Sequence, residues 1–503
     1  MRGHYSRVAG RVAAVCYTRC VRASRAKIFL PLLGSLLTLQ VGAQAPAGRS
    51  LYIPYSDARP ILESLEDILP AELKNLPAEQ RPAAWPNFVK KRDAEIRARL
   101  RQGDEDSIVN LLFFGTSFTR QRRVTTEDLA QLSRSGRVRA EQMGAVIQAR
   151  AGDLVQALAA PGNKEAETTL VSANERLAFA QQVVSRNGHD LATTAGRQRA
   201  RQFLYTSVAR VLNEQAGWAA TLEEARRLGN RTEEFAERSR LYRDRGLSLD
   251  ASLRPNFAIE QTLAELKRRG LLVPGSVKRV AVIGPGLDFV DKTSGYDFYP
   301  EQTIQPFAVM DSLLRLGLAD AKALEVTTLD LSPRVNAHVR RMRQRAASGA
   351  TYTVQLPRET GAGWREEFVA YWQKFGEQIG VEAKAAALPE GVEGLAIRAM
   401  RIRPRTVLRV RAADLNVVLQ RLDGAGYDLI VATNILVYYD LFEQCLALKN
   451  VERMLRPGGL LLSNNALLEL PSSSVRSVGY LTTVYSSRAD DGDHIVWYQK
   501  GRD

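Results

Sequence analysis

The sequence predicts a doubly wound α/β domain with a mostly parallel sheet over residues 277–503, preceded by a mainly helical region. The first observation is an apolar run, Val280–Ile283, that ends in a turn from Gly284 to Gly286. The second is a later apolar run that ends in Asp330. A strand that stops at a glycine turn lets backbone amides approach a ligand, and an acid closing the next strand can bind two ribose hydroxyls. Together they predict a domain that binds a nucleoside-bearing cofactor.

Strand-like and helix-like segments alternate along this domain. Apolar runs typical of strands occur at residues 278–283, 324–329, 407–410, 429–432 and 460–463. Apolar residues at helical spacing occur at 302–316, 333–345, 413–422 and 441–455. Such alternation predicts a parallel sheet with helices on both faces. The last segments, 479–486 and 494–499, predict an antiparallel hairpin at the sheet edge.

A long insertion interrupts the alternation at about residues 334–405, which is far more than a usual connection between two strands. It holds a strand-like run at 352–356 and an amphipathic helical pattern at 364–379. An insertion at this point of the chain is expected to lie beside the cofactor crevice.

Two regions precede the α/β domain. Residues 44–86 are rich in proline, which permits short helices such as 61–69 but not a long one. Residues 87–272 show apolar residues at helical spacing among Arg and Glu, and predict a mainly helical domain whose role the pattern does not indicate. Its helices are expected to include residues 126–151, 170–185, 197–214, 221–228 and 259–269.

Residues 1–43 have the order of a secretory signal peptide. A basic stretch, Arg19–Lys27, precedes an apolar run of fourteen residues, Ile28–Val41, and small residues follow up to Ala43. A membrane-spanning helix needs about twenty residues, so no stable span is expected after cleavage. The pattern predicts a bacterial protein that is exported to the periplasm or secreted. The alternatives are a short membrane anchor, or an upstream start codon that adds residues to a cytoplasmic protein.

The composition excludes several classes of function. The net charge is +15, but the first 43 residues hold seven basic and no acidic residues, which leaves +8 for the rest. A basic chain attracts phosphates, yet no nucleic-acid recognition module accompanies the charge, so a nucleic-acid partner is not favoured.

Cys445 is the single cysteine beyond the N-terminal region and cannot form an internal disulfide. The four histidines show no metal-ligand spacing, so no metal is expected, and His338 on a basic helix is expected to be solvated.

Over about residues 277–500 the chain resembles class I S-adenosylmethionine-dependent methyltransferases, which have a Rossmann-like fold. Five motifs match in order along the sequence: Val280–Gly286, Thr328–Asp330, Arg411–Leu415, Tyr427–Asn434 and Leu455–Leu462. The last two are especially similar to the chemotaxis-receptor methyltransferases, as is the segment that follows Asn434. The ordered set is more specific than any one motif.

The resemblance implies S-adenosylmethionine as the cofactor and assigns roles to particular residues. Gly284 and Gly286 would let the backbone close around the amino-acid part of the cofactor. Asp330 would accept both ribose hydroxyls, Asp414 would accept from the exocyclic amine of adenine, and Leu415 would pack against the base. All of these residues are expected at the carboxyl ends of strands, where open α/β sheets bind ligands.

Several of these residues have a second interpretation. Asp330 and Asp414 each precede a predicted helix and could be its N-cap. Asn434 and Tyr438 are the candidates for contact with the substrate, and Asn434 also for contact with the cofactor, but both could simply complete the crevice wall. The loop Tyr296–Tyr299 could cover the cofactor or form a surface turn.

Three departures from the family pattern bear on the site. Many members carry an acid two residues before the first glycine, where this chain has Val282. Asp288 stands where a third small residue is common, and either contacts the amino group of the cofactor in place of the missing acid or marks a pocket that has decayed. The signature of amino methylation is absent at Asn434, which disfavours a nucleic-acid base as acceptor.

The leading hypothesis is methyl transfer from S-adenosylmethionine to an unidentified small-molecule or protein acceptor. The alternative is an exported, non-catalytic binding protein that keeps the fold, because S-adenosylmethionine is made in the cytoplasm. A nicotinamide-dependent dehydrogenase is a weaker reading, since the segment 288–300 separates the glycine turn from the next helix.

Overall fold

The computed structural model describes residues 48–125, 128, 137–160, 174–228, 253–289, 296–488 and 491–502. The predicted signal peptide, residues 1–43, lies outside the described residues. Within the described ranges, no helix is both long enough and apolar enough to cross a membrane.

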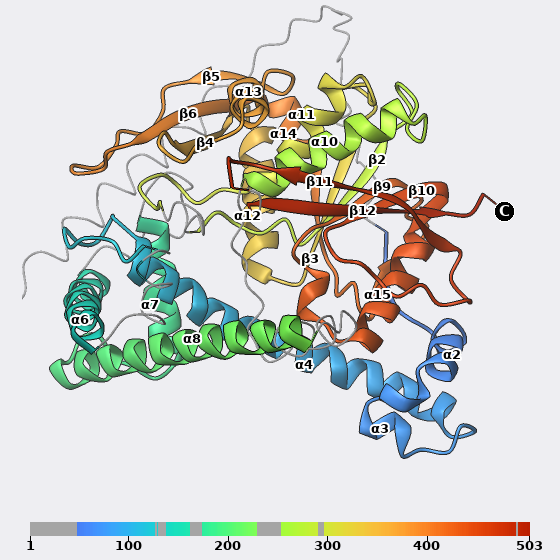
Figure 1. Ribbon diagram of the computed structural model, residues 1–503, viewed down its shortest axis with the longest axis horizontal. Coiled ribbons are helices and arrows are strands. Elements are labelled where there is room, and N and C mark those ends of the chain that lie inside the picture. The colour runs from blue at the N-terminus through green and yellow to red at the C-terminus, as the bar shows by residue number, and fades with distance from the viewer. Residues whose placement is uncertain are drawn as a thin grey trace, which may run out of the picture. The chain divides into compact units, whose positions relative to one another are not determined.

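A seven-stranded sheet is the centre of the C-terminal half (Figure 1). Five strands are parallel, and the last two form an antiparallel hairpin at one edge. In spatial order the strands are β11 (Val475–Val484), β12 (Gly492–Lys500), β10 (Leu455–Ser463), β9 (Tyr427–Ala432), β2 (Arg279–Ile283), β3 (Glu325–Asp330) and β7 (Val410–Asp414). This order confirms the doubly wound α/β fold and the edge hairpin.

Both faces of the sheet are covered, which explains why its central strand is apolar along almost its whole length. Ala281 and Ile283 of β2 belong to one hydrophobic core, and Val280 and Val282 belong to the other. The helices of this half are α10 (Arg254–Arg268), α11 (Gln305–Arg315), α12 (Pro333–Ala347), α14 (Pro404–Val407), η3 (Leu436–Tyr438) and α15 (Leu441–Met454).

The direction of the strand order reverses at β2. From β2 the chain proceeds outward through β3 and β7, and it then returns to place β9 and β10 on the other side of β2. In open α/β sheets such a reversal leaves a crevice at the carboxyl ends of the strands, where ligands bind. The topology therefore positions a site beyond Ile283, Asp330 and Ala432, the last residues of β2, β3 and β9.

Two predictions around the third strand are wrong. The expected strand 407–410 is the end of helix α14 followed by the start of β7, because Pro404 fits the first turn of a helix. The expected helix 413–422 is the end of β7, a turn, and β8 (Gln420–Leu422), which pairs with β1 (Ser50–Tyr52). In the turn the side chain of Asn416 accepts from the backbone N–H of Val418, a local bond that competes with a helix.

The insertion forms a small three-stranded antiparallel sheet and a helix. Its elements are β4 (Tyr352–Glu359), α13 (Glu366–Lys374), β5 (Gly380–Ala383) and β6 (Leu395–Ile402), with the strand order β4-β6-β5. The carboxylate of Asp311 in α11 accepts the backbone N–H groups of Gly376 and Gln378, each at 3.0 Å. The small sheet is thereby attached to α11.

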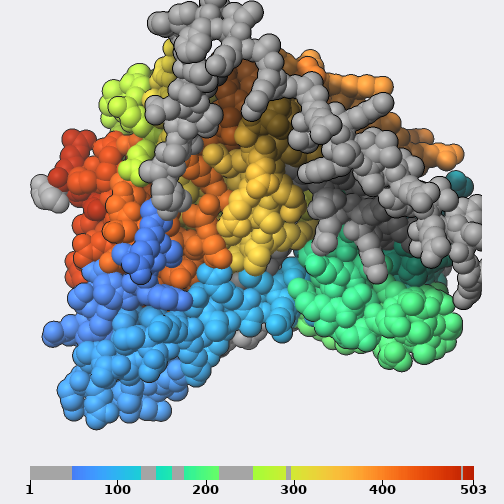
Figure 2. Space-filling model, turned by 180° about the vertical axis from the view of Figure 1, so that it is seen from behind, coloured from blue at the N-terminus to red at the C-terminus, as the bar shows by residue number. Residues whose placement is uncertain are grey.

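The proline-rich segment contains more helix than expected. It holds α2 (Tyr55–Ser64), η1 (Glu66–Ile68), α3 (Ala71–Lys74) and the start of α4 (Arg81–Phe114). Helix α4 begins at Arg81 and continues through Pro86, where the expected proline-rich segment ends. Pro82 lies in the first turn, which suits a proline, whereas Pro86 lies within the helix. Trp85 and Phe88 of α4 pack in the same core as the sheet. Figure 2 shows the blue N-terminal part of the chain against the orange C-terminal part.

Among the described residues between α4 and α10 there are three helices: α6 (Arg137–Ala159), α7 (Asn174–Arg186) and α8 (Thr194–Leu228). The two helices expected at 197–214 and 221–228 are one continuous helix, α8. Arg176 of α7 is fully buried and donates to backbone carbonyls of Asp288 and Asp297, at 2.9 and 3.1 Å, and of Phe289 and Tyr299. The loop that follows the glycine turn is therefore held by the helical region.

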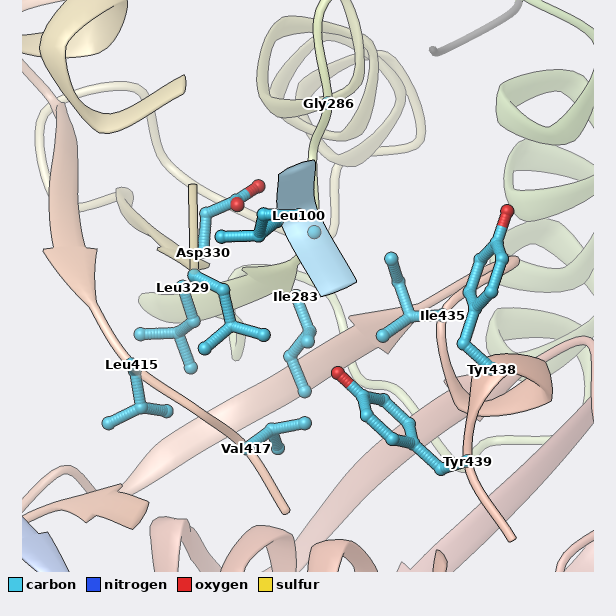
Figure 3. A pocket seen from close by; sticks show the side chains of 12 residues that line it. Leu100, Ile283, Gly286, Leu329, Asp330, Leu415, Val417, Ile435, Tyr438 and Tyr439 are labelled. Atoms are coloured by element: carbon cyan, nitrogen blue, oxygen red, sulfur yellow. The ribbon is translucent and has the colours of Figure 1, made fainter. Parts of the chain in front are cut away.

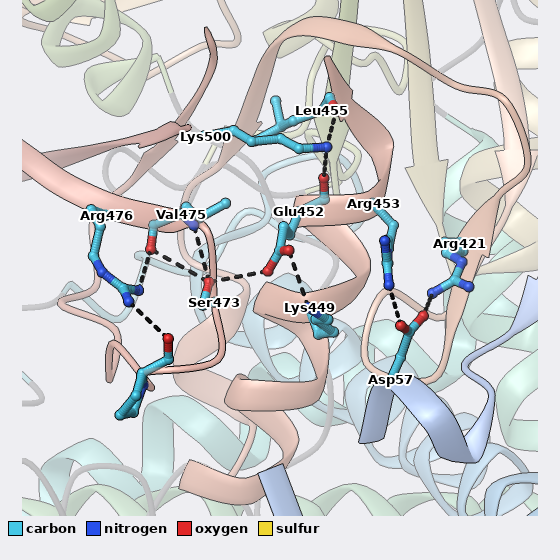
Figure 4. A network of polar contacts seen from close by, with 11 residues as sticks. Asp57, Arg421, Lys449, Glu452, Arg453, Leu455, Ser473, Val475, Arg476 and Lys500 are labelled. Carbon is cyan, nitrogen blue, oxygen red and sulfur yellow. Dashed lines mark hydrogen bonds and ion pairs between the residues drawn. The ribbon is translucent and has the colours of Figure 1, made fainter. Parts of the chain in front are cut away.

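Asp57 links α2 to the α/β half (Figure 4). Its carboxylate accepts from Nη1 of Arg421 in β8 at 2.6 Å and from Nη2 of Arg453 in α15. Burial opposes ionisation of this side chain, but the hydrogen bonds from the two guanidinium groups outweigh it and lower the pKa of Asp57. The N-terminal helices are thus attached by charge as well as by apolar packing.

Replacing Asp57 with Asn should lower the free energy of unfolding by about 1–3 kcal/mol at pH 7, because two guanidinium groups lose their counter-charge. Since the folded-state pKa is depressed, the contribution is present at neutral pH and is lost as the pH falls through the folded pKa. Urea denaturation at pH 7 and pH 3 measures both. Glu63→Gln, which breaks the exposed pair with Arg59 on the same helix, should have almost no effect. Equal effects of the two variants would contradict the assignment.

Candidate functional site

A cavity lies at the carboxyl ends of the central strands, and we call it the strand-end cavity (Figure 3). Its walls come from the ends of β2 and β3, the segments after β7 and β9, and helix α4. The lining residues are Leu100, Ile283, Gly284, Gly286, Leu329, Asp330, Leu331, Leu415, Val417, Ile435, Tyr438 and Tyr439. Five predicted site residues therefore meet here: Gly284, Gly286, Asp330, Leu415 and Tyr438.

The glycine turn has the backbone conformation that the sequence predicts for a close approach. Gly284 and Gly286 have φ values of 61° and 65°, a region that side chains disfavour. A Cβ added to Gly284 would lie 2.1 Å from Cδ1 of Ile435. The space above the first glycine is therefore filled by an isoleucine side chain from the segment after β9.

Asp330 is buried at the end of β3, with 6% of its surface exposed. Its carboxylate accepts the backbone N–H of Ser332 at 2.7 Å and that of Gly286. Burial nevertheless raises the pKa of Asp330 to about 7, and the nearby Asp414 contributes in the same direction. The helix N-cap interpretation is wrong for Asp330, because Ser332 caps α12 by accepting from the backbone N–H of Val335.

Asp414 ends β7 directly opposite Asp330 but does not line the cavity. Its Oδ1 forms an ion pair with Nη1 of Arg97 in α4 at 2.8 Å. The N-cap interpretation is wrong here too, since no helix follows β7 before β8. The carboxylate assigned to adenine by the resemblance is thus paired within the chain.

Asp288 lies in the loop after the glycine turn, outside the strand-end cavity. Its Oδ2 accepts from the hydroxyl of Tyr299 and from Nε2 of Gln302, both at 2.8 Å. The interpretation of Tyr296–Tyr299 as a surface turn is wrong: Tyr296 and Tyr299 are buried, and Asp297 accepts from the backbone and hydroxyl of Thr116. The loop packs against the end of α4, because Arg176 and Asp297 supply the partners that a buried loop needs.

Asn434 follows β9 with a φ of 58°, and it is the non-glycine residue with positive φ among those described. It is exposed, its backbone N–H donates to Oδ1 of Asn464 at 2.8 Å, and its side chain accepts from the same residue. Asn434 does not line the cavity, whereas Tyr438 does. The segment between them supplies Ile435, which the sequence did not single out.

Helix α4 contributes residues that no sequence motif indicated. Leu100 enters the strand-end cavity, close to Asp330 in Figure 3. Arg97 donates to the carbonyl of Leu331 at 3.4 Å, and Nη2 of Arg99 donates to the carbonyl of Tyr438 at 2.9 Å. The helix therefore lies across the carboxyl ends of the strands and covers the cavity.

No group of three or more His, Cys, Asp or Glu side chains within the described ranges is placed to hold a metal ion. The expectation of a solvated His338 is wrong. The side chain is fully buried, and its Nε2 lies 2.9 Å from the hydroxyl of Tyr352. Burial lowers the pKa of His338 to about 3, so the imidazole is neutral and belongs to the core.

The residue types around the strand-end cavity fit the cofactor that the sequence resemblance implies. A buried carboxylate suits a ribose diol, positive-φ glycines leave backbone groups accessible, and Leu415 and Val417 are apolar enough to contact a base. The volume does not fit: the cavity measures about 50 Å³, whereas pockets for ligands of this size span about 300–1,000 Å³. A cofactor of this size would need more space than the structure shows between Leu100 of α4 and Ile435.

Neither family models nor curated protein sequences match this chain. Among solved structures, it is similar to the N-methyltransferase NodS from Bradyrhizobium japonicum with S-adenosyl-L-homocysteine, with a TM-score of 0.25 and 14% identity over 53% of this chain and 98% of that one. The CurJ carbon methyltransferase gives a TM-score of 0.24 and 13% identity, over 90% and 100% of the two chains. A possible exported protein from Bordetella parapertussis gives 0.23 and 12%, over 58% and 88%. Because these TM-scores are low, the fold is assigned from the strand order, and the function is argued from the residues of the site.

We compare the free energy of unfolding of Asp330→Asn with that of the parent protein. From pH 5 to pH 8 this difference should change by roughly 2–4 kcal/mol in favour of the variant. The folded-state pKa of about 7 exceeds the unfolded value of about 4, so stability linked to this proton declines as the pH rises through 7. Asn keeps an accepting oxygen and cannot ionise. Urea denaturation at both pH values measures this difference. A difference in free energy of unfolding that is the same at pH 5 and pH 8 would show that the pKa of Asp330 is not raised.

Proposed function

We propose that the protein transfers a methyl group from S-adenosylmethionine to an acceptor. The observation that carries the proposal is the convergence of Gly284, Gly286, Asp330 and Leu415 at one cavity. These residues come from the ends of three strands that are far apart in the sequence. Their shared position, at the reversal of strand order, is where the fold class binds ligands.

When bound, S-adenosylmethionine supplies an electrophilic methyl group on a sulfonium. The residues of the cavity would hold it: the ionised carboxylate of Asp330 would accept from the ribose hydroxyls, and Leu415 and Val417 would contact the base. Leu100 of α4 would help to exclude water, and Tyr438 lines the same cavity. Transfer of this kind depends mainly on alignment and exclusion of water, so it requires no covalent intermediate with the chain.

The acceptor class follows from the sequence resemblance alone. The segment after Asn434 is similar to that of the chemotaxis-receptor methyltransferases, which makes a carboxylate one candidate acceptor. The signal peptide predicted for residues 1–43 would direct the protein outside the cytoplasm, where the cofactor would have to be supplied.

A second function is favoured by the geometry of the closed crevice. The small volume, the ion pair of Asp414 with Arg97, and Val282 in place of the family acid all suit an exported binding protein that no longer takes the cofactor. The two functions differ in one property, which is whether the crevice opens to a cofactor.

Calorimetry with S-adenosylmethionine and S-adenosylhomocysteine distinguishes the two functions. For a methyltransferase we expect micromolar binding by the full-length protein. Asp330→Ala should weaken it at least about 30-fold, because two charge-assisted hydrogen bonds are lost. Thermal unfolding of both proteins confirms that they are folded. No binding at millimolar ligand by the folded parent would favour the non-catalytic protein.

Leu100→Ala should increase the affinity for S-adenosylhomocysteine by about threefold or more, because the smaller side chain leaves space beside Asp330. Arg101→Ala, an exposed neighbour on α4, is the matched control and should leave the affinity unchanged. Titration calorimetry measures all three proteins. An affinity for Leu100→Ala equal to or below that of Arg101→Ala would show that α4 does not limit access to the cavity.

A further inference from the structure

A second cavity lies on the other side of Leu100, between α7, α12 and α4, and we call it the α7–α12 cavity. Its volume is about 360 Å³, within the range of ligand-binding pockets. Glu175, Phe179 and Arg186 line it from α7, at a spacing that places them on one face of that helix. Arg334 and Arg341 line it from α12, two turns apart. The two helices therefore present charged side chains to a common space.

The charges around the cavity are balanced in number. Three acidic residues, Asp104, Glu175 and Glu301, face three arginines. Two pairs are formed within the chain: Arg186 donates to Asp104 at 2.8 Å, and Arg334 donates to Glu301. A ligand with a large net charge would be repelled by one of these sets, so the cavity suits a ligand whose net charge is close to zero.

Glu175 and Arg341 are the two charged residues of the cavity that take part in neither of these pairs. Neither forms a hydrogen bond or ion pair with another residue in the described ranges, and Oε2 of Glu175 is buried there without a partner. Buried polar atoms are normally satisfied, so this oxygen is placed to accept from a ligand. Arg341 is close enough to lower the pKa of Glu175 by its charge. One group of each sign is therefore available in the same cavity.

Arg334 adds a second donor with a fixed orientation. Its guanidinium lies 3.7 Å from the ring centre of Phe179 and 4.4 Å from that of Phe289, and such contacts restrict an arginine side chain. Nη2 is used by Glu301, while Nη1 is buried without an acceptor among the described residues. Nη1 can therefore join Arg341 in binding an anionic group.

We propose that the α7–α12 cavity binds a zwitterionic amino carboxylate, such as a free amino acid or a close derivative. Its carboxylate accepts from Arg341 and Nη1 of Arg334, and its ammonium group donates to Glu175. Leu100 and Phe179 contact an apolar side chain of the ligand. A dianion such as a phosphate ester is disfavoured by the three carboxyl groups. The proposal does not rest on methyl transfer, because binding here requires no cofactor.

The pH dependence of binding follows from the surroundings of Glu175. Burial, and then the charge of Glu301, raise its pKa to about 7, against the opposing charges of Arg176, Arg341 and Arg334. An ammonium group binds the ionised carboxylate, so affinity should be higher at pH 8 than at pH 6. Asp104 on α4 also faces this cavity and is paired with Arg186.

The test begins with the full-length protein and no S-adenosylmethionine. The melting temperature is measured with each of the twenty standard L-amino acids at 10 mM, and the amino acid with the largest shift is titrated by calorimetry. Two analogues of it are then compared, one lacking the amino group and one lacking the carboxylate. Each should bind at least about 10-fold more weakly, because each loses a charge-assisted contact.

Two variants assign the contacts. Arg341→Gln should weaken the amino acid about 10-fold and leave the decarboxylated amine unchanged. Glu175→Gln should weaken the amino acid, leave the deaminated acid unchanged, and remove the difference between pH 6 and pH 8. Arg340→Gln, an exposed neighbour on α12, should change nothing. The proposal is overturned if no amino acid binds at 10 mM, if the analogues bind as tightly, or if Arg341→Gln behaves like Arg340→Gln.

Discussion

The contact of α4 with the segment after β7 is the constraint on which the rest of the site depends. Asp93 and Arg97 are one turn apart and form an ion pair at 3.1 Å. Asp93 also accepts from the hydroxyl of Tyr52 and from Nδ2 of Asn416, at 2.9 and 2.8 Å, and Arg97 binds Asp414. Because these bonds fix both the position and the rotation of the helix, they determine which α4 side chains face the ends of the strands.

The position of α4 decides the electrostatics of the strand-end cavity. With Leu100 above it, Asp330 is shielded from water, and burial is the main reason that its pKa rises to about 7. An acid at the end of an uncovered strand would be solvated and fully ionised at neutral pH. The same closure that protects a bound cofactor from water therefore makes the empty carboxylate unfavourable in its ionised form.

The central fold could be predicted from the sequence because its signals are local. An apolar strand, a glycine turn and a closing acid are each recognised within a few residues, and they predicted that Gly284, Gly286 and Asp330 lie at the ends of β2 and β3. The role of α4 could not be predicted, since Leu100 is one apolar residue among many at helical spacing, and only long-range packing selects it. The loop at Tyr296–Tyr299 misled the prediction for a related reason: its burial depends on Arg176, which is more than a hundred residues away in sequence.

Leu100 lines both cavities, and the two differ in chemistry in a way that bears on function. The strand-end cavity holds one carboxylate among apolar residues, a combination suited to a nucleoside with hydroxyls and an apolar face. The α7–α12 cavity holds groups of both signs, with Glu175 and Arg341 left unpaired among the described residues. A single ligand that filled both cavities would have to extend past the side chain of Leu100 and contact apolar residues on one side and charged residues on the other. Two ligands of different chemistry, one on each side of Leu100, satisfy them separately. A binding protein that has lost the cofactor would still retain the second cavity.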